Sequence, residues 1–280
     1  MSFETPNPPF GTFALPPRLD RLRLRAEGFS RRWIASGVRR LVQRSRPEPY
    51  DVEVFGNQKA RLYPSDNRAE KRVLCGTQFW DLAERTRLRQ AMAATDGPFH
   101  FVDAGANVGM YTLSVRAHTI RARLKTRIVA IEPDPVNAAR LRCNLAASGA
   151  LDVHHAAVAL SDSVGEVRFV SGGLENRGEA RIGDGDLTLP SRPLLDVVTQ
   201  AGFDRIDAMK MDIEGHEVTV LTSFFADAPE RMLPRLVIME TGRDGSGPLT
   251  ALMRANGYEI ESETGINTIF VLSGSAQPSE

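Results

Sequence analysis

The sequence predicts an α/β protein built on a doubly wound, mostly parallel sheet. From Phe99 onward, short apolar runs that are typical of buried strands alternate with segments of helical composition. A short turn at Thr264-Gly265 joins the last two predicted strands, so we expect an antiparallel last strand. A loop with two glycines follows the first strand, and ligands of open α/β sheets bind beyond the carboxyl ends of the strands.

Composition excludes several classes of protein. The chain has 280 residues, of which 42% are hydrophobic, so it can bury one large core. Its formal net charge is zero, which does not favour a nucleic-acid-binding protein, and no apolar run approaches the length of a membrane span. The two cysteines, Cys75 and Cys143, lie far apart and have no metal-like spacing. We therefore expect a cytoplasmic protein without a structural zinc site or a disulfide framework.

Composition and pattern divide the chain into four segments. Residues 1–17 are rich in proline and are expected to be disordered, and residues 273–280 form a tail. Residues 18–98 are expected to form a basic helical segment, a hairpin that turns at Gly56-Asn57, and a further helix. Residues 99–272 carry the alternating pattern and form the main domain. Within it, residues 172–190 contain many turn formers and are expected to be a loop.

The basic segment has two interpretations. Arg18 to Arg46 includes ten arginines and two acids, with an apolar stripe between them. The segment either packs as an accessory helix on the main domain, or presents a basic amphipathic surface to an anionic membrane or an acidic partner. The second interpretation predicts peripheral membrane association.

The loop in FVDAGANVGMYTLS, residues 101–114, does not fit a phosphate ligand. The dinucleotide motif G-x-G-x-x-G needs glycine where this chain has Asn107, and Asp103 places a carboxylate where a pyrophosphate would lie. No Lys-Ser or Lys-Thr pair follows, which excludes a Walker A loop. S-adenosylmethionine has a sulfonium, an amino group and no phosphate, and it satisfies these constraints.

Glu132 ends the second strand of the main domain, 23 residues after Gly109. A carboxylate at this position can accept hydrogen bonds from both hydroxyls of a ribose. The same acid occurs in NAD-binding domains, so it does not discriminate between the two ligands. Its alternative is a purely structural role at the start of the next helix.

Four blocks together resemble the FkbM family of S-adenosylmethionine-dependent methyltransferases. They are FVDAGANVGMYTLS, AIEPDPVNAARLRCNL, KMDIEGHE and VIMET, in the family's order and spacing, and the resemblance covers roughly residues 52–272. It implies a class I methyltransferase fold, with a mostly parallel seven-stranded sheet whose last strand is antiparallel. It also implies which residues hold S-adenosylmethionine: Asp103, Gly105, Ala106, Asn107 and Gly109 at the methionine part, Glu132, Pro133 and Asp134 at the ribose, and Ala157 and Val158 near the adenine.

The block KMDIEGHE, residues 210–217, is the candidate reaction centre. It puts five ionisable groups into eight residues at the end of a strand that should neighbour the first one. Transfer of a methyl group to oxygen needs alignment and removal of a hydroxyl proton. We interpret Asp212 or Glu214 as base or orienting acid, His216 as a competing base, and Glu240 as a further candidate. The clustered carboxylates allow a divalent metal, but their spacing does not require one, and no metal ligand is assigned.

The predicted function is O-methylation of a hydroxyl, first on a sugar, glycan or glycoside, and alternatively on a secondary-metabolite scaffold of polyketide type. Members of the resembled family commonly methylate such hydroxyls. A distant alternative is an NAD-dependent oxidoreductase of similar topology. We expect no nucleic-acid substrate, because the chain lacks the Asn-Pro-Pro-Tyr type of tetrapeptide that many base-modifying relatives carry. The acceptor is expected to meet the N-terminal segment and residues 172–186. Arg177, Arg181 and Arg192 are either contacts for an anionic acceptor or solvated side chains.

Overall fold

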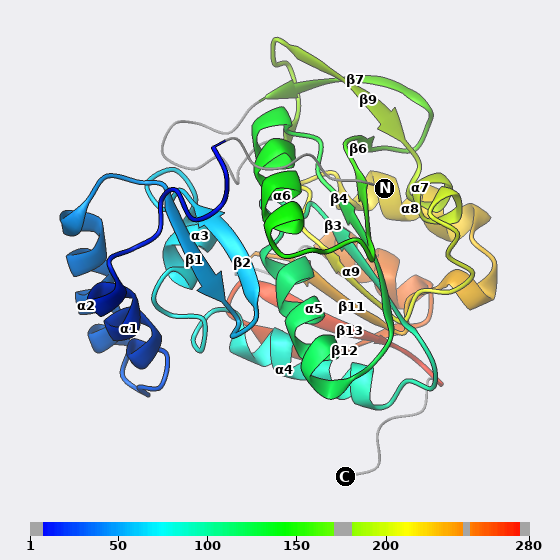
Figure 1. Ribbon diagram of the computed structural model, residues 1–280. Coiled ribbons are helices and arrows are strands. Elements are labelled where there is room, and N and C mark those ends of the chain that lie inside the picture. Colours follow the sequence, from blue (N-terminus) through cyan, green and yellow to red (C-terminus); the bar gives the residue numbers. More distant parts are fainter. Residues whose placement is uncertain (1–7, 171–180, 243–246, 275–280) are drawn as a thin grey trace.

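The computed structural model describes residues 8–170, 181–242 and 247–274, and its centre is a seven-stranded sheet (Figure 1). The strand order is β12-β13-β11-β10-β3-β4-β5. Neighbours from β5 to β11 pair in parallel, and β13 is antiparallel to both β11 and β12. The strands are β3 (Phe99–Ala104), β4 (Thr126–Ile131), β5 (Val153–Ala156), β10 (Ala208–Met211), β11 (Leu236–Glu240), β12 (Tyr258–Thr264) and β13 (Asn267–Leu272). This confirms the predicted doubly wound sheet and its antiparallel last strand.

Helices cover both faces of this sheet, which explains why its central strands are continuously apolar. Every residue of β3 and β10 is buried. One face packs against α4 (Leu82–Ala93), α5 (Met110–Ala122) and α6 (Pro135–Ala147). The other packs against α7 (Leu194–Gln200), α8 (Glu217–Asp227) and α9 (Gly247–Ala255), with a short 3₁₀ helix, η2, at Glu230–Met232. The carboxyl ends of β3, β4, β10 and β11 therefore meet at one edge.

The N-terminal segment forms an extension that packs beside α6 (Figure 1). It consists of α1 (Pro17–Ala26), α2 (Arg32–Ser45), the hairpin β1 (Tyr50–Val54) and β2 (Gln58–Leu62), and α3 (Arg68–Val73). The hairpin turns where Gly56-Asn57 was predicted. Arg61 N–H donates to Asn144 Oδ1 of α6 at 2.7 Å, and the extension shares one apolar core with the sheet.

The structure differs from the expectation of a disordered start within residues 8–16. Asp51 Oδ2 accepts the Gly11 and Phe13 N–H groups at 2.7 and 3.1 Å, and Ala14 bridges to Asp51. The buried Asp51 carboxylate holds this stretch, because it needs donors to offset its loss of solvent. A proline-rich composition gave no sign of that partner.

A second difference lies in the expected loop of residues 172–190. Residues 171–180, including Arg177, lie outside the described residues. The described remainder contributes two strands to a small sheet of order β6-β9-β7-β8, seen above α6 in Figure 1. Its strands are β6 (Ala159–Leu160), β7 (Gly165–Val170), β8 (Arg181–Ile182) and β9 (Leu187–Arg192). β9 alternates buried and exposed residues and pairs with β7, although Pro190 and the preceding glycines favour a loop.

Within the described ranges, no helix combines the length and apolarity needed to cross a membrane.

Candidate active site

The loop after β3 has a backbone that only certain residues adopt. Gly105, Asn107 and Gly109 have φ values of 77°, 52° and 89°, in the left-handed region that favours glycine and tolerates asparagine. A Cβ on Gly105 would lie 1.8 Å from the Asp212 carbonyl oxygen, and one on Gly109 would lie 2.5 Å from Leu141 Cδ1. The glycines thus let the loop pack directly against the end of β10 and against α6. Ala106 and Asn107 line the cavity beyond the loop.

Asp103, which lies within β3, anchors the helix that follows the loop. Its Oδ2 accepts the Thr112 backbone N–H at 2.9 Å and the Thr112 hydroxyl at 2.6 Å. Burial raises the pKa of Asp103 to about 6, although the two hydrogen bonds from Thr112 act in the opposite direction. Asp103 also lines the cavity, so one carboxylate fixes α5 and faces the ligand side.

Glu132 connects the loop to the end of β4. Its Oε2 accepts the Asn107 N–H at 2.7 Å and its Oε1 accepts the Asp134 N–H at 2.9 Å. Burial raises the pKa of Glu132 to about 8. Each carboxylate oxygen has a further lone pair, and the side chain lines the cavity, so Glu132 can accept hydroxyl donors there.

The other predicted donor-site residues separate into two groups. Pro133 and Val158 line the cavity. Asp134 does not, because its Oδ1 accepts the Val136 and Asn137 N–H groups at 3.0 and 2.9 Å and caps α6. Ala157 is exposed and lies off the cavity wall.

Lys210 and Asp212 bring the predicted reaction centre beside the loop. β10 pairs with β3 and places Lys210 opposite Asp103. The buried Lys210 Nζ lies 3.4 Å from Asp212 Oδ2 and 3.4 Å from Asn267 Oδ1. The Asp212 side chain is 37% exposed, so it keeps access to the cavity while it pairs with the lysine.

The turn after Asp212 directs two further candidates to the cavity. Glu214 has a φ of 56°, and both Glu214 and His216 line the cavity. His216 Nε2 is buried without a hydrogen-bond partner among the described residues. Glu217 instead accepts the Ile213 N–H at 3.0 Å and stabilises the start of α8.

Glu240 and Asp81 complete an acidic cluster around Lys210. Burial raises the pKa of Glu240, and the charge of Asp212 raises it further, whereas Lys210 lowers it. Burial also raises the pKa of Asp81, whose carboxylate accepts the Tyr111 hydroxyl at 2.9 Å. Asp81 was missed by sequence reasoning: an aspartate before a helix is typical of a cap, but this one makes no side-chain cap and has a φ of 41°.

The predicted site residues other than Gly109, Asp134 and Ala157 border one cavity of about 950 Å³. Lys210 and Asp81 border it too, whereas Glu217 does not. The extension forms a wall of it with residues of α2, α3 and the segment up to α4, among them Phe79 and Trp80. Asn67, the N-cap of α3, donates to Asn107 Oδ1 at 2.7 Å and so joins this wall to the loop. The sequence predicted that the N-terminal segment contacts the acceptor. It did not predict that the extension contacts the loop after β3, residues 105–109, which we call the donor loop because it is expected to bind the methyl donor.

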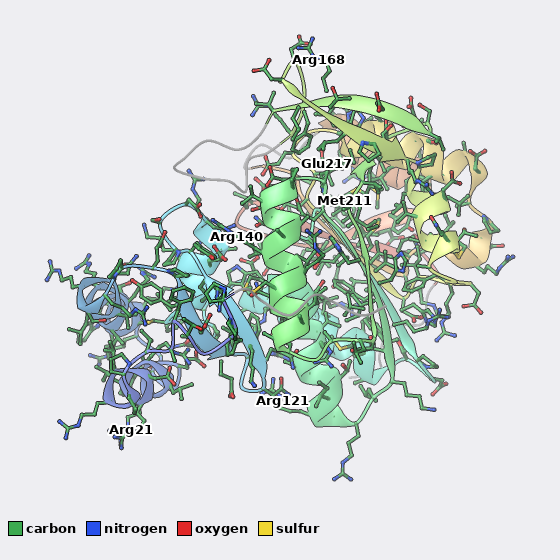
Figure 2. The ribbon with its side chains drawn as sticks, turned by 45° about the horizontal axis from the view of Figure 1, so that its top comes forward. Arg21, Arg121, Arg140, Arg168, Met211 and Glu217 are labelled. Atoms are coloured by element: carbon green, nitrogen blue, oxygen red, sulfur yellow. The ribbon has the colours of Figure 1, made fainter. Side chains whose placement is uncertain are left out.

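The basic segment 18–46 divides into inward and outward arginines. Arg23 is fully buried and pairs with Asp20 and Glu27 at 2.7 and 3.1 Å. Arg32 and Arg39 line the cavity. Arg21 points away from the molecule at the outer side of α1 in Figure 2. Arg23 also donates to the Glu53 carbonyl of β1 at 2.9 Å, so the segment packs on the hairpin of the extension. Its contact with a membrane or an acidic partner stays a prediction.

No group of three or more His, Cys, Asp or Glu side chains suited to hold a metal occurs in residues 8–170, 181–242 and 247–274.

The chain is similar to known methyltransferases. The family model described as Methyltransferase FkbM domain matches residues 103–260. Methyltransferase sdnD of Sordaria araneosa is 29% identical over 199 residues, which cover 58% of this chain and 74% of that protein. Two solved structures are similar: the methyltransferase FkbM of Methylobacillus flagellatus (TM-score 0.43, 15% identity, 75% of this chain and 56% of that one) and the METTL16 methyltransferase domain (TM-score 0.49, 11% identity, 86% and 79%).

Proposed function

The chain belongs to the FkbM methyltransferase family and is an S-adenosylmethionine-dependent methyltransferase, and we propose that it methylates a hydroxyl oxygen of a sugar, glycan or glycoside. The observation that carries this proposal is the group of carboxylates, Asp212, Glu240 and Asp81, around Lys210 beside the donor loop. Such a group can bind several hydroxyls and accept a proton from one of them.

The residues at the loop fit S-adenosylmethionine. Burial raises the pKa of Glu132 although it accepts two backbone N–H groups, and its oxygens can also accept two ribose hydroxyls. The close approach of Gly105 to Asp212 brings the donor loop next to the acidic cluster. When bound, S-adenosylmethionine supplies a methyl group activated by a positively charged sulfonium. The Asp103 carboxylate favours that positive charge, and the loop positions it.

Removal of the acceptor's proton is assigned to Asp212, with Glu240 as the second candidate. Asp212 is partly exposed and its ion pair with Lys210 fixes its orientation. The raised pKa of Glu240 makes its carboxylate bind a proton more tightly than an ordinary glutamate does. His216 competes for this role, since its Nε2 is buried without a partner among the described residues. Alignment of the hydroxyl contributes at most about 7–11 kcal/mol and the base about 10²- to 10⁴-fold in rate.

A secondary-metabolite scaffold of polyketide type is the second candidate acceptor. Phe79, Trp80 and Tyr111 line the cavity and would pack against a large apolar ring system. The same rings also stack on sugars. An acceptor with few hydroxyls would leave the carboxylates of the cavity without hydrogen-bond donors, so a sugar is the favoured acceptor.

The test is methyl transfer from S-adenosylmethionine carrying a labelled methyl group to a panel of sugars, glycosides and polyketide-type alcohols, with the product bond assigned by NMR. We expect label on oxygen of a sugar, and turnover of the polyketide-type alcohols at background level. Label found only on nitrogen or carbon would reject O-methylation, and turnover confined to the apolar alcohols would favour the second candidate.

A further inference from the structure

Arginines gather on the wall of the cavity that the extension supplies. Arg32 and Arg39 come from α2, and Arg68 and Arg72 come from α3. The opposite side of the same cavity carries Asp212, Glu214 and Glu240. The cavity therefore has a basic wall and an acidic wall.

Three of these arginines have no acidic partner among the described residues. The Arg32 guanidinium lies 5.6 Å from the centre of the Phe79 ring, and Arg39 donates to the Lys71 carbonyl and the Ser36 hydroxyl at 3.4 Å each. In the described part of the chain, no carboxylate lies within 4.0 Å of Arg32, Arg39 or Arg72.

Arg61 and Arg140 do have such partners, because Arg61 pairs with Asp51 at 2.7 Å and Arg140 pairs with Asp66 at 2.8 Å. Exposed arginines such as Arg40 also have no ion pair among the described residues, but they do not line the cavity. The three unpaired arginines of the cavity wall differ from these because a ligand in the cavity can reach them.

Arg72 connects this wall to the reaction centre. Its charge acts on Asp81, which also feels Lys210, so the three side chains are close enough to interact. We do not include Arg68 in the proposed anion site. It directly follows Asn67, whose amide donates to Asn107 of the loop after β3, so it lies on the side of the cavity where S-adenosylmethionine binds.

Resting on the proposed function, we propose that the acceptor sugar carries an anionic group, a phosphate or a carboxylate, which binds Arg32, Arg39 and Arg72 while its reacting hydroxyl lies at Asp212 and Glu240. Planar guanidinium groups bind such anions through paired hydrogen bonds. The carboxylates repel an anion from the reaction centre, so the two walls orient the acceptor. A volume of about 950 Å³ is near the upper end of ligand pockets, about 300–1,000 Å³, and suits a donor together with a sugar.

The experiment measures binding without requiring turnover. The full chain is saturated with S-adenosylhomocysteine, which fills the donor site, and is titrated by calorimetry with glucose 6-phosphate, glucuronate and glucose. The test variant is the double substitution Arg39→Gln and Arg72→Gln. The matched control is Arg40→Gln, because Arg40 is exposed, follows Arg39 on α2 and does not line the cavity.

We expect at least one of the two anionic sugars to bind about tenfold or more tightly than glucose, and this advantage to disappear in the double variant but not in R40Q. Tighter binding of glucose 6-phosphate identifies the anionic group as a phosphate, and tighter binding of glucuronate identifies it as a carboxylate. Equal binding of all three sugars to the wild type, or an anion preference that survives in the double variant, would overturn the inference. Anion binding that depends on both arginines in a chain that methylates no sugar would reject the proposed acceptor and leave the anion site standing.

Discussion

Asp212 and Glu240 illustrate how two carboxylates at neighbouring strand ends acquire different properties. Asp212 meets solvent and pairs with the Lys210 ammonium, whereas Glu240 is half-buried and has a raised pKa. The contact with Lys210 thus holds the Asp212 side chain in place, while burial raises the pKa of Glu240. A substitution at Asp212 separates the two roles.

Asp212→Asn is expected to lower turnover by about 10²- to 10⁴-fold, because the amide cannot accept the hydroxyl proton. S-adenosylmethionine should bind with nearly unchanged affinity, since Gly105 approaches the Asp212 carbonyl, which the substitution keeps. Turnover is measured with labelled donor and affinity by calorimetry. Glu263→Gln, an exposed acid on β12, is the control and should retain activity. Near-normal turnover of D212N would remove Asp212 from the mechanism and leave Glu240 or His216 as base.

Among single residues, those expected to bind S-adenosylmethionine were predictable from local patterns in the sequence. Many of the residues expected to bind the acceptor were not. Asp103, Asn107 and Glu132 follow strands of a recognisable type, so their place at the carboxyl edge follows from the chain order alone. Asp81 comes from a segment without such a pattern, and only tertiary packing brings it to Tyr111 of the loop motif, at 2.9 Å. The role of Asp134 shows the converse, because a motif residue beside the site is used as a helix cap.

At the scale of elements, α3 couples the extension to the donor loop. Asn67 Oδ1 accepts the Ala69 and Glu70 N–H groups and caps the helix, while its Nδ2 donates to Asn107. Alternating strands and helices of the main domain could be predicted because each buries its own apolar face. The contact between Asn67 at the start of α3 and Asn107 of the loop could not be predicted, because two residues 40 positions apart form no periodic pattern in the sequence.

Asn67→Ala is expected to destabilise the chain by about 0.5–2 kcal/mol through loss of the cap. It should also weaken binding of S-adenosylmethionine, because Asn107 loses the partner that holds its left-handed conformation. Chemical unfolding and calorimetry measure the two effects. Ser148→Ala is the matched control: Ser148 Oγ binds the Lys59 N–H and carbonyl and joins the extension to α6 away from the loop. If both variants bind the donor equally well, α3 does not organise the loop.

At the scale of the whole molecule, the extension and the main domain form one folding unit. Residues of α1, α2 and both hairpin strands share an apolar core with β3, α5 and α6. Arg140 of α6 pairs with Asp66 at 2.8 Å through both nitrogens and lies 4.0 Å from the Tyr63 ring, and Figure 2 shows it on the side of α6 that faces the extension. We infer that unfolding the extension removes a wall of the cavity as well as part of the core.

Glu70 makes this unit sensitive to pH. It is fully buried at the junction, and its carboxyl oxygens have no hydrogen-bond partner among the described residues, with Arg140 Nη1 3.6 Å away. Burial raises the pKa of Glu70 to about 8, against the opposing effect of the Arg140 charge. In the unfolded chain the pKa of a glutamate is about 4.3. The folded chain therefore holds a proton that the unfolded chain releases between these two values, and the free energy of unfolding falls as pH rises from about 4.3 to 8.

Glu70→Gln should remove this contribution, because a neutral amide does not titrate. The free energy of unfolding of E70Q minus that of the wild type should increase between pH 5.5 and 8.5, by an amount on the order of a few kcal/mol, because only the wild type loses this stability. Urea unfolding at the two pH values measures this difference, and each curve should show a single transition that includes the extension. Glu53→Gln, an exposed acid on β1, should follow the wild type at both pH values. An E70Q stability that parallels the wild type would mean that Glu70 is ionised in the folded chain and that Arg140 holds its charge at the junction.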